Sequence, residues 1–254
     1  MVDTHAHLSV CEPGDDELVV AAEAAGVRRI LTVGLDEAHN RAAVEAAEQH
    51  DAVFASVGRH PNSAGGFGDA TAAAIDGLAS HPMVRAVGET GLDYYRDGSP
   101  REDQRAAFAA QVEIAQRHGL PVVIHVRDPD GSSDAVDEVF ATLDEMGTRD
   151  VVLHCFSVPG RVRDAAERGW HCSFAGNVTY PRAEELRRAA AEVPDHLILV
   201  ETDAPFLAPQ PVRGKPNQPA HVVATAEVVA AARGASYAET EALVEANAAR
   251  AFAW

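Results

Sequence analysis

The 254-residue chain has little basic charge: Lys215 is its only lysine, and 21 basic residues face 39 aspartates and glutamates, giving a formal net charge of −18. Because protein affinity for phosphate backbones comes chiefly from Lys and Arg, this balance disfavours nucleic-acid binding at low salt. The simplest interpretation is a solvated acidic, halophile-like surface, as a high-salt cytoplasm would favour, and the alternative is a cationic partner. Bound divalent ions can reverse the charge of a local pocket, so the net charge does not exclude an anionic substrate.

The chain also has few cysteines and no long apolar run. Cys11, Cys155 and Cys172 are too few and too scattered for a disulfide framework, and their odd number leaves at least one thiol free. The longest apolar stretch, residues 222–232, is interrupted by Glu227 and is too short to span a bilayer. The first residues lack the basic flank and apolar core of a secretory signal. We therefore expect a cytoplasmic protein without a membrane segment.

Short apolar runs alternate with longer helix-period segments along the chain, and no change in composition marks a domain boundary. This alternation predicts repeated β-α units and a parallel sheet, and the length suits one TIM-like (β/α)₈ barrel domain spanning residues 1–254. The expected strands are residues 2–8, 29–34, 53–57, 84–89, 121–125, 151–156, 170–174 and 196–203. The helices named from the pattern are residues 36–50, 100–118, 134–146, 181–191, 220–233 and 236–247.

Ionisable side chains follow five of these apolar runs. The carboxyl ends of the strands of a parallel barrel open into one cavity, so these side chains are expected to meet there. A pair such as His5 and His7, spaced i and i+2, faces one side of a strand but arises easily by chance among 12 histidines, so its weight comes from the other strand ends. The candidate metal ligands are His5, His7, Glu89, His125, His154 and Asp203.

These residue types suit two divalent ions. A carboxylate such as Glu89 has two oxygens and can bridge two hard cations, whereas a neutral imidazole cannot. We expect His5, His7 and Asp203 at the first ion and His125 and His154 at the second. The alternatives are hydrogen-bonded core histidines and a carboxylate that caps a turn. Mixed imidazole and carboxylate ligands fit Mg²⁺, Mn²⁺, Zn²⁺ or Fe²⁺.

Two ions held together can lower the pKa of a shared water and stabilise an attacked phosphoryl or carbonyl group, so no nucleophilic side chain is needed. Cys155 follows His154, and in an extended strand its side chain points away from the cavity. We therefore interpret Cys155 as a small buried hydrophobic residue rather than a nucleophile.

Seven short motifs rich in polar and small residues follow one another along the chain. The motifs are Asp3-Thr4-His5-Ala6-His7-Leu8, Gly58-Arg59-His60-Pro61, Gly88-Glu89-Thr90-Gly91-Leu92-Asp93-Tyr94, His125-Val126-Arg127-Asp128, His154-Cys155-Phe156-Ser157, Glu201-Thr202-Asp203-Ala204-Pro205 and Arg213-Gly214-Lys215-Pro216-Asn217-Gln218-Pro219. Together and in this order they resemble the TatD family of metal-dependent deoxyribonucleases in the amidohydrolase superfamily. The resemblance runs from residue 2 to near residue 250.

The resemblance implies a Mg²⁺-supported nuclease, often a 3′ to 5′ exonuclease whose substrate is single-stranded DNA or a DNA 3′ end, with metal ligands at the six positions given above. It further implies that His60 contacts substrate phosphate, that Glu201 assists near the metals, and that Arg213, Lys215 and Asn217 shape a substrate-binding loop. Val158-Pro159 replaces a commoner glycine after the His154 motif, which puts the shape of that loop in doubt. The acidic surface implies DNA binding at high salt or at a narrow positive mouth.

The residues themselves leave alternatives open at these positions. Glu201 stands two residues before Asp203, on the same strand face, where it relays a proton or fills the barrel as a charge paired to arginine. His60 is a phosphate contact or a hydrogen-bonding loop residue. Arg127 binds phosphate through two parallel hydrogen bonds or pairs with Asp128 at the surface.

Two other functions fit the same ligands. A water activated by two metals also attacks carbonyl groups, so hydrolysis of an ester or amide, such as an aminoacyl-tRNA bond, is the main alternative. No lysine is placed to bridge metals after carboxylation, which weakens cyclic-amide chemistry. A non-catalytic, metal-stabilised scaffold is the third interpretation, disfavoured because an open site without cysteine ligands is typical of catalysis. The sequence leaves the oligomeric state unknown.

Overall fold

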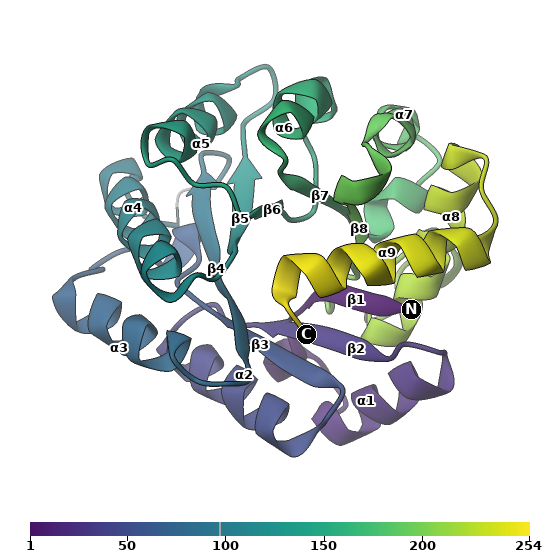
Figure 1. The fold of residues 1–254 in the computed structure, drawn as a ribbon, viewed down its shortest axis with the longest axis horizontal. Helices are drawn as coiled ribbons and strands as arrows, with labels where there is room; N and C mark the ends of the chain where they lie inside the picture. The colour runs from purple at the N-terminus through teal and green to yellow at the C-terminus, as the bar shows by residue number, and fades with distance from the viewer. Residues whose placement is uncertain (97) are drawn as a thin grey trace.

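The computed structural model describes residues 1–96 and 98–254. Within them, eight parallel strands follow one another in chain order around a nearly closed ring, and the helices pack outside it (Figure 1). An isolated parallel bridge from Ala6 to Ala204 links the first strand to the segment after the last strand. The expected TIM-like barrel is thereby confirmed. The strands are β1 (Val2–Ala6), β2 (Arg29–Val33), β3 (Val53–Val57), β4 (Val84–Asp93), β5 (Val122–Arg127), β6 (Val151–Leu153), β7 (His171–Phe174) and β8 (Ile198–Val200).

The outer layer contains three helices that were not named from the pattern, α1, α3 and α6. Helix α6 is only seven residues long, and in α1 Val20 is exposed, so neither gives a clean apolar stripe in sequence. The helices are α1 (Asp15–Ala24), α2 (Glu37–Gln49), α3 (Asp69–Ala79), α4 (Arg101–His118), α5 (Asp134–Glu145), α6 (Val162–Arg168), α7 (Glu184–Glu192), α8 (Val222–Arg233) and α9 (Tyr237–Phe252).

Helix boundaries follow local hydrogen bonding. The Asp36 carboxylate accepts hydrogen bonds from two backbone N–H groups in the first turn of α2, and Ser236 forms a capping box with Glu239 at the start of α9. Gly119 ends α4 in the left-handed region, where glycine is free of the steric penalty of a Cβ atom. These are the start and stop signals that the sequence supplies.

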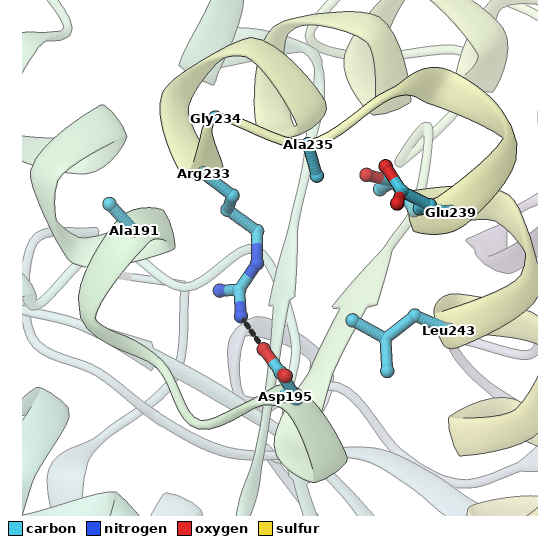
Figure 2. Close-up of a pocket in the computed structure, with 8 residues that line it drawn as sticks. Ala191, Asp195, Arg233, Gly234, Ala235, Glu239 and Leu243 are labelled. Atoms are coloured by element: carbon cyan, nitrogen blue, oxygen red, sulfur yellow. Dashed lines mark hydrogen bonds and ion pairs between the residues drawn. The ribbon is translucent and has the colours of Figure 1, made fainter.

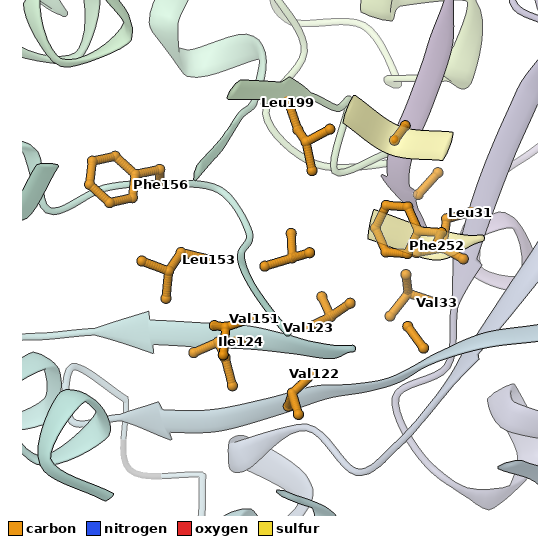
Figure 3. Close-up of a cluster of buried hydrophobic side chains, with 14 of the residues drawn as sticks. Leu31, Val33, Val122, Val123, Ile124, Val151, Leu153, Phe156, Leu199 and Phe252 are labelled. Carbon is orange, nitrogen blue, oxygen red and sulfur yellow. The ribbon is translucent and has the colours of Figure 1, made fainter. Parts of the chain in front are cut away.

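One cluster of buried apolar side chains holds the barrel together. The strands contribute buried Val, Ile and Leu, and helix α9 adds Phe252 to the cluster that contains Leu31 and Leu199 (Figure 3). Full burial of one such side chain contributes about 1.5–3 kcal/mol. The Asn247 amide of α9 also donates to the carbonyls of Asp195 and Ile198, at the beginning of β8. Helix α9 thus packs against the amino-terminal end of the barrel and leaves the carboxyl ends of the strands to form the site.

Several strands end elsewhere than expected. Strand β4 continues four residues beyond Glu89 to Asp93, because Thr90 to Asp93 pair with β5 after a register shift. Strands β6 and β8 end at Leu153 and Val200, before the residues that carry the chemistry. The expected extension of those two strands through 156 and 203 is therefore wrong.

No helix in the part of the chain that the structure describes combines the length and apolar character required to cross a bilayer. All three cysteines are free thiols.

Candidate metal centre

Six ionisable side chains, carried by β1, β4, β5 and the segments that follow β1, β6 and β8, meet in one cluster at the carboxyl end of the barrel. The Nε2 atoms of His5 and His7 lie 3.2 Å apart, and His7 Nε2 lies 3.5 Å from Oδ1 of Asp203. Donor atoms of His5, His154 and Asp203 fall within 4.8 Å of one another, as do those of His5, His7 and Glu89. The structure therefore brings together every ligand predicted from the sequence: His5, His7, Glu89, His125, His154 and Asp203.

Glu89 stands at the centre of the cluster with its two oxygens facing different histidines. Its Oε1 atom lies 2.7 Å from His125 Nδ1 and 2.8 Å from His154 Nε2. Its Oε2 atom lies 3.5 Å from His5 Nε2 and 3.6 Å from His7 Nε2. A carboxylate that divides its oxygens between two groups of imidazoles has the geometry needed to bridge two cations.

Hydrogen bonds made outside the cluster fix the tautomers of three histidines. His7 Nδ1 lies 2.8 Å from the Val33 carbonyl, so it carries the proton and leaves the Nε2 lone pair facing the cluster. His154 Nδ1 likewise faces Oε1 of Glu201 at 3.0 Å. His125 Nε2 faces Oδ2 of Asp93 at 3.3 Å, so Nδ1 is the ring nitrogen that faces the cluster. These contacts are the carboxylate or carbonyl partners that usually orient metal-binding imidazoles.

His60 has the opposite arrangement. Its Nδ1 atom accepts a hydrogen bond from the Asn62 backbone N–H at 3.0 Å, so the proton resides on Nε2, which lies 3.5 Å from Oε1 of Glu89. Burial lowers the pKa of His60 to about 3, so the ring is neutral. Although its ring nitrogen is close enough to Glu89 and His125 to complete a ligand triad, this tautomer makes His60 a hydrogen-bond donor.

The electrostatics of the cluster favour a bound cation. Burial alone raises the pKa of Glu89, but the imidazoles of His154 and His60 lower it well below its usual range. Burial likewise opposes a charge on His154, yet Glu89 and Glu201 raise its pKa well above normal. The field that holds a proton here also attracts a metal ion. Oε2 of Glu201, two residues before Asp203, is a buried carboxylate oxygen without a hydrogen-bond partner, which leaves it free to interact with a further positive charge.

Glu201 and Asp203 reach the cluster from irregular backbone after β8. The expectation that they share a strand face is wrong, because β8 has already ended and Asp203 has a left-handed φ of 55°. Oε1 of Glu201 accepts from His154 Nδ1 and from the Cys155 backbone N–H at 2.8 Å. Glu201 is therefore a support for His154 and not a charge paired to arginine.

Cys155 also lies outside a strand, with a φ of 42°, so its expected alternation with His154 is wrong. Burial, together with the charges of Asp203, Glu201 and Glu89, raises the pKa of the Cys155 thiol well above its usual value. A protonated thiol is a poor nucleophile. The structure thus agrees with a non-nucleophilic Cys155 for an electrostatic reason and not for the geometric one.

The residues predicted to bind substrate differ in how far they are buried. Arg127 is exposed and its guanidinium stacks 4.0 Å from the centroid of the Tyr95 ring, while the Asp128 carboxylate instead accepts from the first turn of α5. Arg213 stacks 3.8 Å from the centroid of the Tyr180 ring, and Lys215 is exposed. Asn217 is fully buried.

Both Asn217 amide hydrogens are used within the protein. Its Nδ2 donates to the carbonyls of Thr202, at 2.8 Å, and Phe206, at 2.6 Å. Asn217 therefore shapes the loop from inside and leaves no amide hydrogen for a ligand.

Three residues close to the cluster were not singled out from the sequence: Asp93, Tyr95 and Phe206. Asp93 accepts from Asn62 Nδ2 at 2.9 Å as well as facing His125. Burial raises its pKa, but the hydrogen bond and charge of His125, together with hydrogen bonds from Asn62 and the Arg96 backbone, hold the pKa below its usual range. Asp93 belongs to the same sequence motif as Glu89, and its position four residues after that candidate ligand was the signal that the sequence offered. The sequence offered no comparable signal for Tyr95 or Phe206.

A separate pocket of about 550 Å³ lies between the end of α7 and the α8–α9 turn (Figure 2). Its one basic side chain, Arg233, pairs with Asp195 and donates to the carbonyls of Ala190 and Val193. This pocket lies next to Asp195, on the amino-terminal side of β8, and does not belong to the metal centre.

Comparison with known proteins gives a consistent result across the chain. The family model described as TatD related DNase matches residues 2–253. An uncharacterised metal-dependent hydrolase of Bacillus subtilis, YabD, is 36% identical over 257 residues, which cover 99% of this chain and 98% of that protein. A protein of Klebsiella pneumoniae named 3′-5′ ssDNA/RNA exonuclease TatD is 34% identical, over 91% of this chain and 89% of its own.

A solved structure shows the same architecture. The crystal structure of YjjV, a TatD homologue from Escherichia coli, superposes with a TM-score of 0.92 at 26% identity, covering 100% of this chain and 98% of the other.

Proposed function

The chain belongs to the TatD related DNase family of metal-dependent hydrolases, and on that basis we propose that it is a phosphodiesterase that removes nucleotides from the 3′ end of single-stranded DNA. The observation that carries the proposal is the arrangement around Glu89: lone pairs of His7, His125 and His154 face the cluster, while the N–H of His60 is available as a donor. The candidate metal ligands and a hydrogen-bond donor suited to a phosphate oxygen thus lie in one cluster.

The ligands fit a pair of divalent ions, which we propose to be Mg²⁺, with Mn²⁺ or Zn²⁺ as substitutes. His5, His7 and Asp203 would hold one ion, His125 and His154 the other, and Glu89 both. Bound there, the ions supply Lewis-acid stabilisation of phosphoryl charge and an activated water.

The chain's own residues perform the remaining tasks. His60, neutral and protonated at Nε2, donates a hydrogen bond to a phosphoryl oxygen, and Arg127, Arg213 and Lys215 supply positive charge at the mouth. As water attacks phosphorus, its proton passes to a carboxylate and the P–O3′ bond breaks, with the leaving oxygen protonated from solvent. We assign the proton to Asp203, whose side chain is 13% exposed and can pass the proton to solvent, whereas Glu201 is 0% exposed and its Oε1 is held by His154 and Cys155.

A direct test uses a 5′-labelled single strand incubated with purified protein and Mg²⁺, Mn²⁺ or Zn²⁺, from low to molar salt. The expected result is shortening from the 3′ end that is abolished by EDTA and by His125→Ala. His39→Ala, which changes a half-exposed histidine beside Asp36, is the matched control and should keep full activity.

Bound metal is measured on the same samples. A protein that holds metal yet leaves the strand intact at every salt concentration, or that cleaves an aminoacyl ester faster than DNA, contradicts the proposal. The cytoplasmic location stays a prediction.

A further inference from the structure

Two of the large hydrophobic side chains that are exposed in the described part of the chain stand at the rim of the metal centre. Tyr95 is 52% exposed and Phe206 is 50% exposed. Tyr95 follows β4 and Phe206 follows β8, so both lie at the carboxyl ends of the strands. Aromatic rings left open to water beside a catalytic cluster indicate a surface for a ligand.

Phe206 is tied directly to the cluster. Its ring centroid lies 6.1 Å from that of His7, and its backbone N–H donates to the Asp203 carbonyl at 2.8 Å. The Asn217 amide holds the Phe206 carbonyl from the buried side. Its backbone is thus anchored on both sides while half of the side chain faces solvent.

Tyr95 is anchored in a comparable way. Its backbone N–H donates to Oδ1 of Asp93 at 3.0 Å, and the other oxygen of Asp93 faces His125. Arg127 lies 4.0 Å above the ring, where a cation is attracted to the π face. The arginine covers one face and leaves half of the side-chain surface exposed.

The two rings stand on opposite sides of the cluster. Strands β1 to β8 follow in order around the barrel, so the β4 and β5 ends that carry Tyr95 and Arg127 lie across from the β8 and β1 ends that carry Phe206 and His7. Glu89, which contacts both His7 and His125, lies between them.

We propose that Tyr95 and Phe206 are stacking platforms for two unpaired nucleobases, one on each side of the phosphate that is cleaved. This inference rests on the proposed nuclease function and specifies its substrate as a strand with exposed bases. Every base presents a π face, so such stacking is strong and independent of sequence. Bases in a duplex are already stacked on their neighbours and cannot occupy the platforms.

The composition of the chain explains why stacking is needed. Nucleic-acid affinity usually comes from phosphate contacts and falls steeply as salt rises. A chain with a net charge of −18 has little such attraction, apart from the few basic groups at the mouth. Stacking is much less sensitive to salt, so two aromatic platforms supply affinity that the acidic surface does not.

The test compares two single strands of equal length, one with thymine at every position and one abasic, which has the same phosphates but no bases. Both carry phosphorothioate linkages that resist hydrolysis, and binding is measured by fluorescence anisotropy with Mg²⁺ at several salt concentrations. We expect the thymine strand to bind roughly tenfold or more tightly, and each of Tyr95→Ala and Phe206→Ala to lose roughly fivefold or more of that preference. Tyr95→Phe and Phe206→Tyr should retain it.

Val20→Ala is the control, because Val20 is 65% exposed on the outer helix α1. Thermal denaturation of each variant checks that the fold is intact. Equal binding of the two strands by the wild-type protein, or a preference that survives both alanine variants, overturns the inference. A preference for thymine in a protein that cleaves no phosphodiester contradicts the proposed reaction but supports the platforms.

Discussion

The Nδ1 atom of His154 lies 3.0 Å from Oε1 of Glu201, and the two side chains are 4% and 0% exposed. This contact places the His154 proton on the side away from Glu89 and leaves the Nε2 lone pair free for a ligand. A buried carboxylate that accepts a hydrogen bond from an imidazole in this way raises the basicity of the ring and fixes its orientation.

Glu201→Gln tests that relationship, because it keeps the shape of the side chain and removes its charge. We expect the affinity for Mn²⁺, measured by isothermal titration calorimetry, to fall roughly tenfold to a hundredfold. Glu48→Gln, a surface carboxylate beside His81, is the control and should bind Mn²⁺ as the wild type does. Unchanged affinity in Glu201→Gln would show that His154 is oriented by other contacts.

Asp93→Asn should weaken the ion on the other side of Glu89. The carboxylate accepts from His125 Nε2 and from Asn62, so its loss frees the His125 ring to change tautomer and rotate. We expect the affinity for the ion held by His125 to fall by about tenfold and the affinity for the other ion to stay the same. Residues that hydrogen-bond to a metal ligand usually contribute about this much to metal affinity. Competition titration with a coloured chelator distinguishes the two ions, and a uniform loss at both contradicts this assignment.

His60→Asn should reduce catalysis without removing metal. Loss of a preorganised donor to transition-state charge lowers kcat by roughly a hundredfold or more. Metal content, measured by atomic emission on the same preparation, should equal that of the wild type because the His60 tautomer makes it a donor. If the bound metal falls in proportion to activity, His60 is a ligand and its position in the proposed mechanism is wrong.

Gly58→Ala should destabilise the fold beside the site. A Cβ atom at Gly58 would lie 2.6 Å from the carbonyl carbon of Gly88 and 2.8 Å from Oε1 of Gln111, so backbone must shift. Overpacking of this kind costs about 1–3 kcal/mol in the free energy of unfolding, measured by urea denaturation. Gly160→Ala is the matched control, because nothing lies within 4 Å of its added atom.

His171→Gln should make the stability of the fold depend less steeply on pH on the acidic side. Burial lowers the pKa of His171 to about 4, below its unfolded value of 6.5, so the unfolded chain binds the extra proton between those pH values. The stability that the neutral ring contributes is complete above pH 6.5 and is lost as the pH falls towards 4. Thermal melts of both proteins across this range should therefore converge at low pH, whereas His81→Gln should follow the wild type. A constant difference would contradict the shift.

The cluster of six candidate ligands could be predicted from sequence because its signal is local. A polar residue that ends an apolar run, such as His125 after Val122 to Ile124, marks the carboxyl end of a strand whichever strands lie beside it. The course of the backbone beyond those ends depends on neighbours that the sequence does not identify. Gly91 illustrates this: a Cβ there would lie 2.1 Å from the His125 carbonyl oxygen, so the glycine serves the close approach of β4 to β5 and does not end the strand.

For a related reason, local sequence patterns predicted neither the two aromatic platforms, Tyr95 and Phe206, nor the contact between Glu201 and His154. An exposed phenylalanine has no periodicity to distinguish it, and Phe206 matters only because the closing barrel places it over His7. Likewise, Cys155 was assigned to a strand because Val151 to Phe156 is an apolar run interrupted by one histidine. Its left-handed backbone follows from the need to present its N–H to Glu201.

The parallel bridge between Ala6 and Ala204 joins the first strand to the segment after the last strand. The hydrogen bond from the His7 backbone N–H to the Ala204 carbonyl reinforces it. His5 and Asp203, on either side of that bridge, become neighbours only once the chain has been synthesised past Asp203 and the ring has closed. The six candidate ligands therefore come together only after the ring has closed, and a chain that stops before Asp203 lacks one of them.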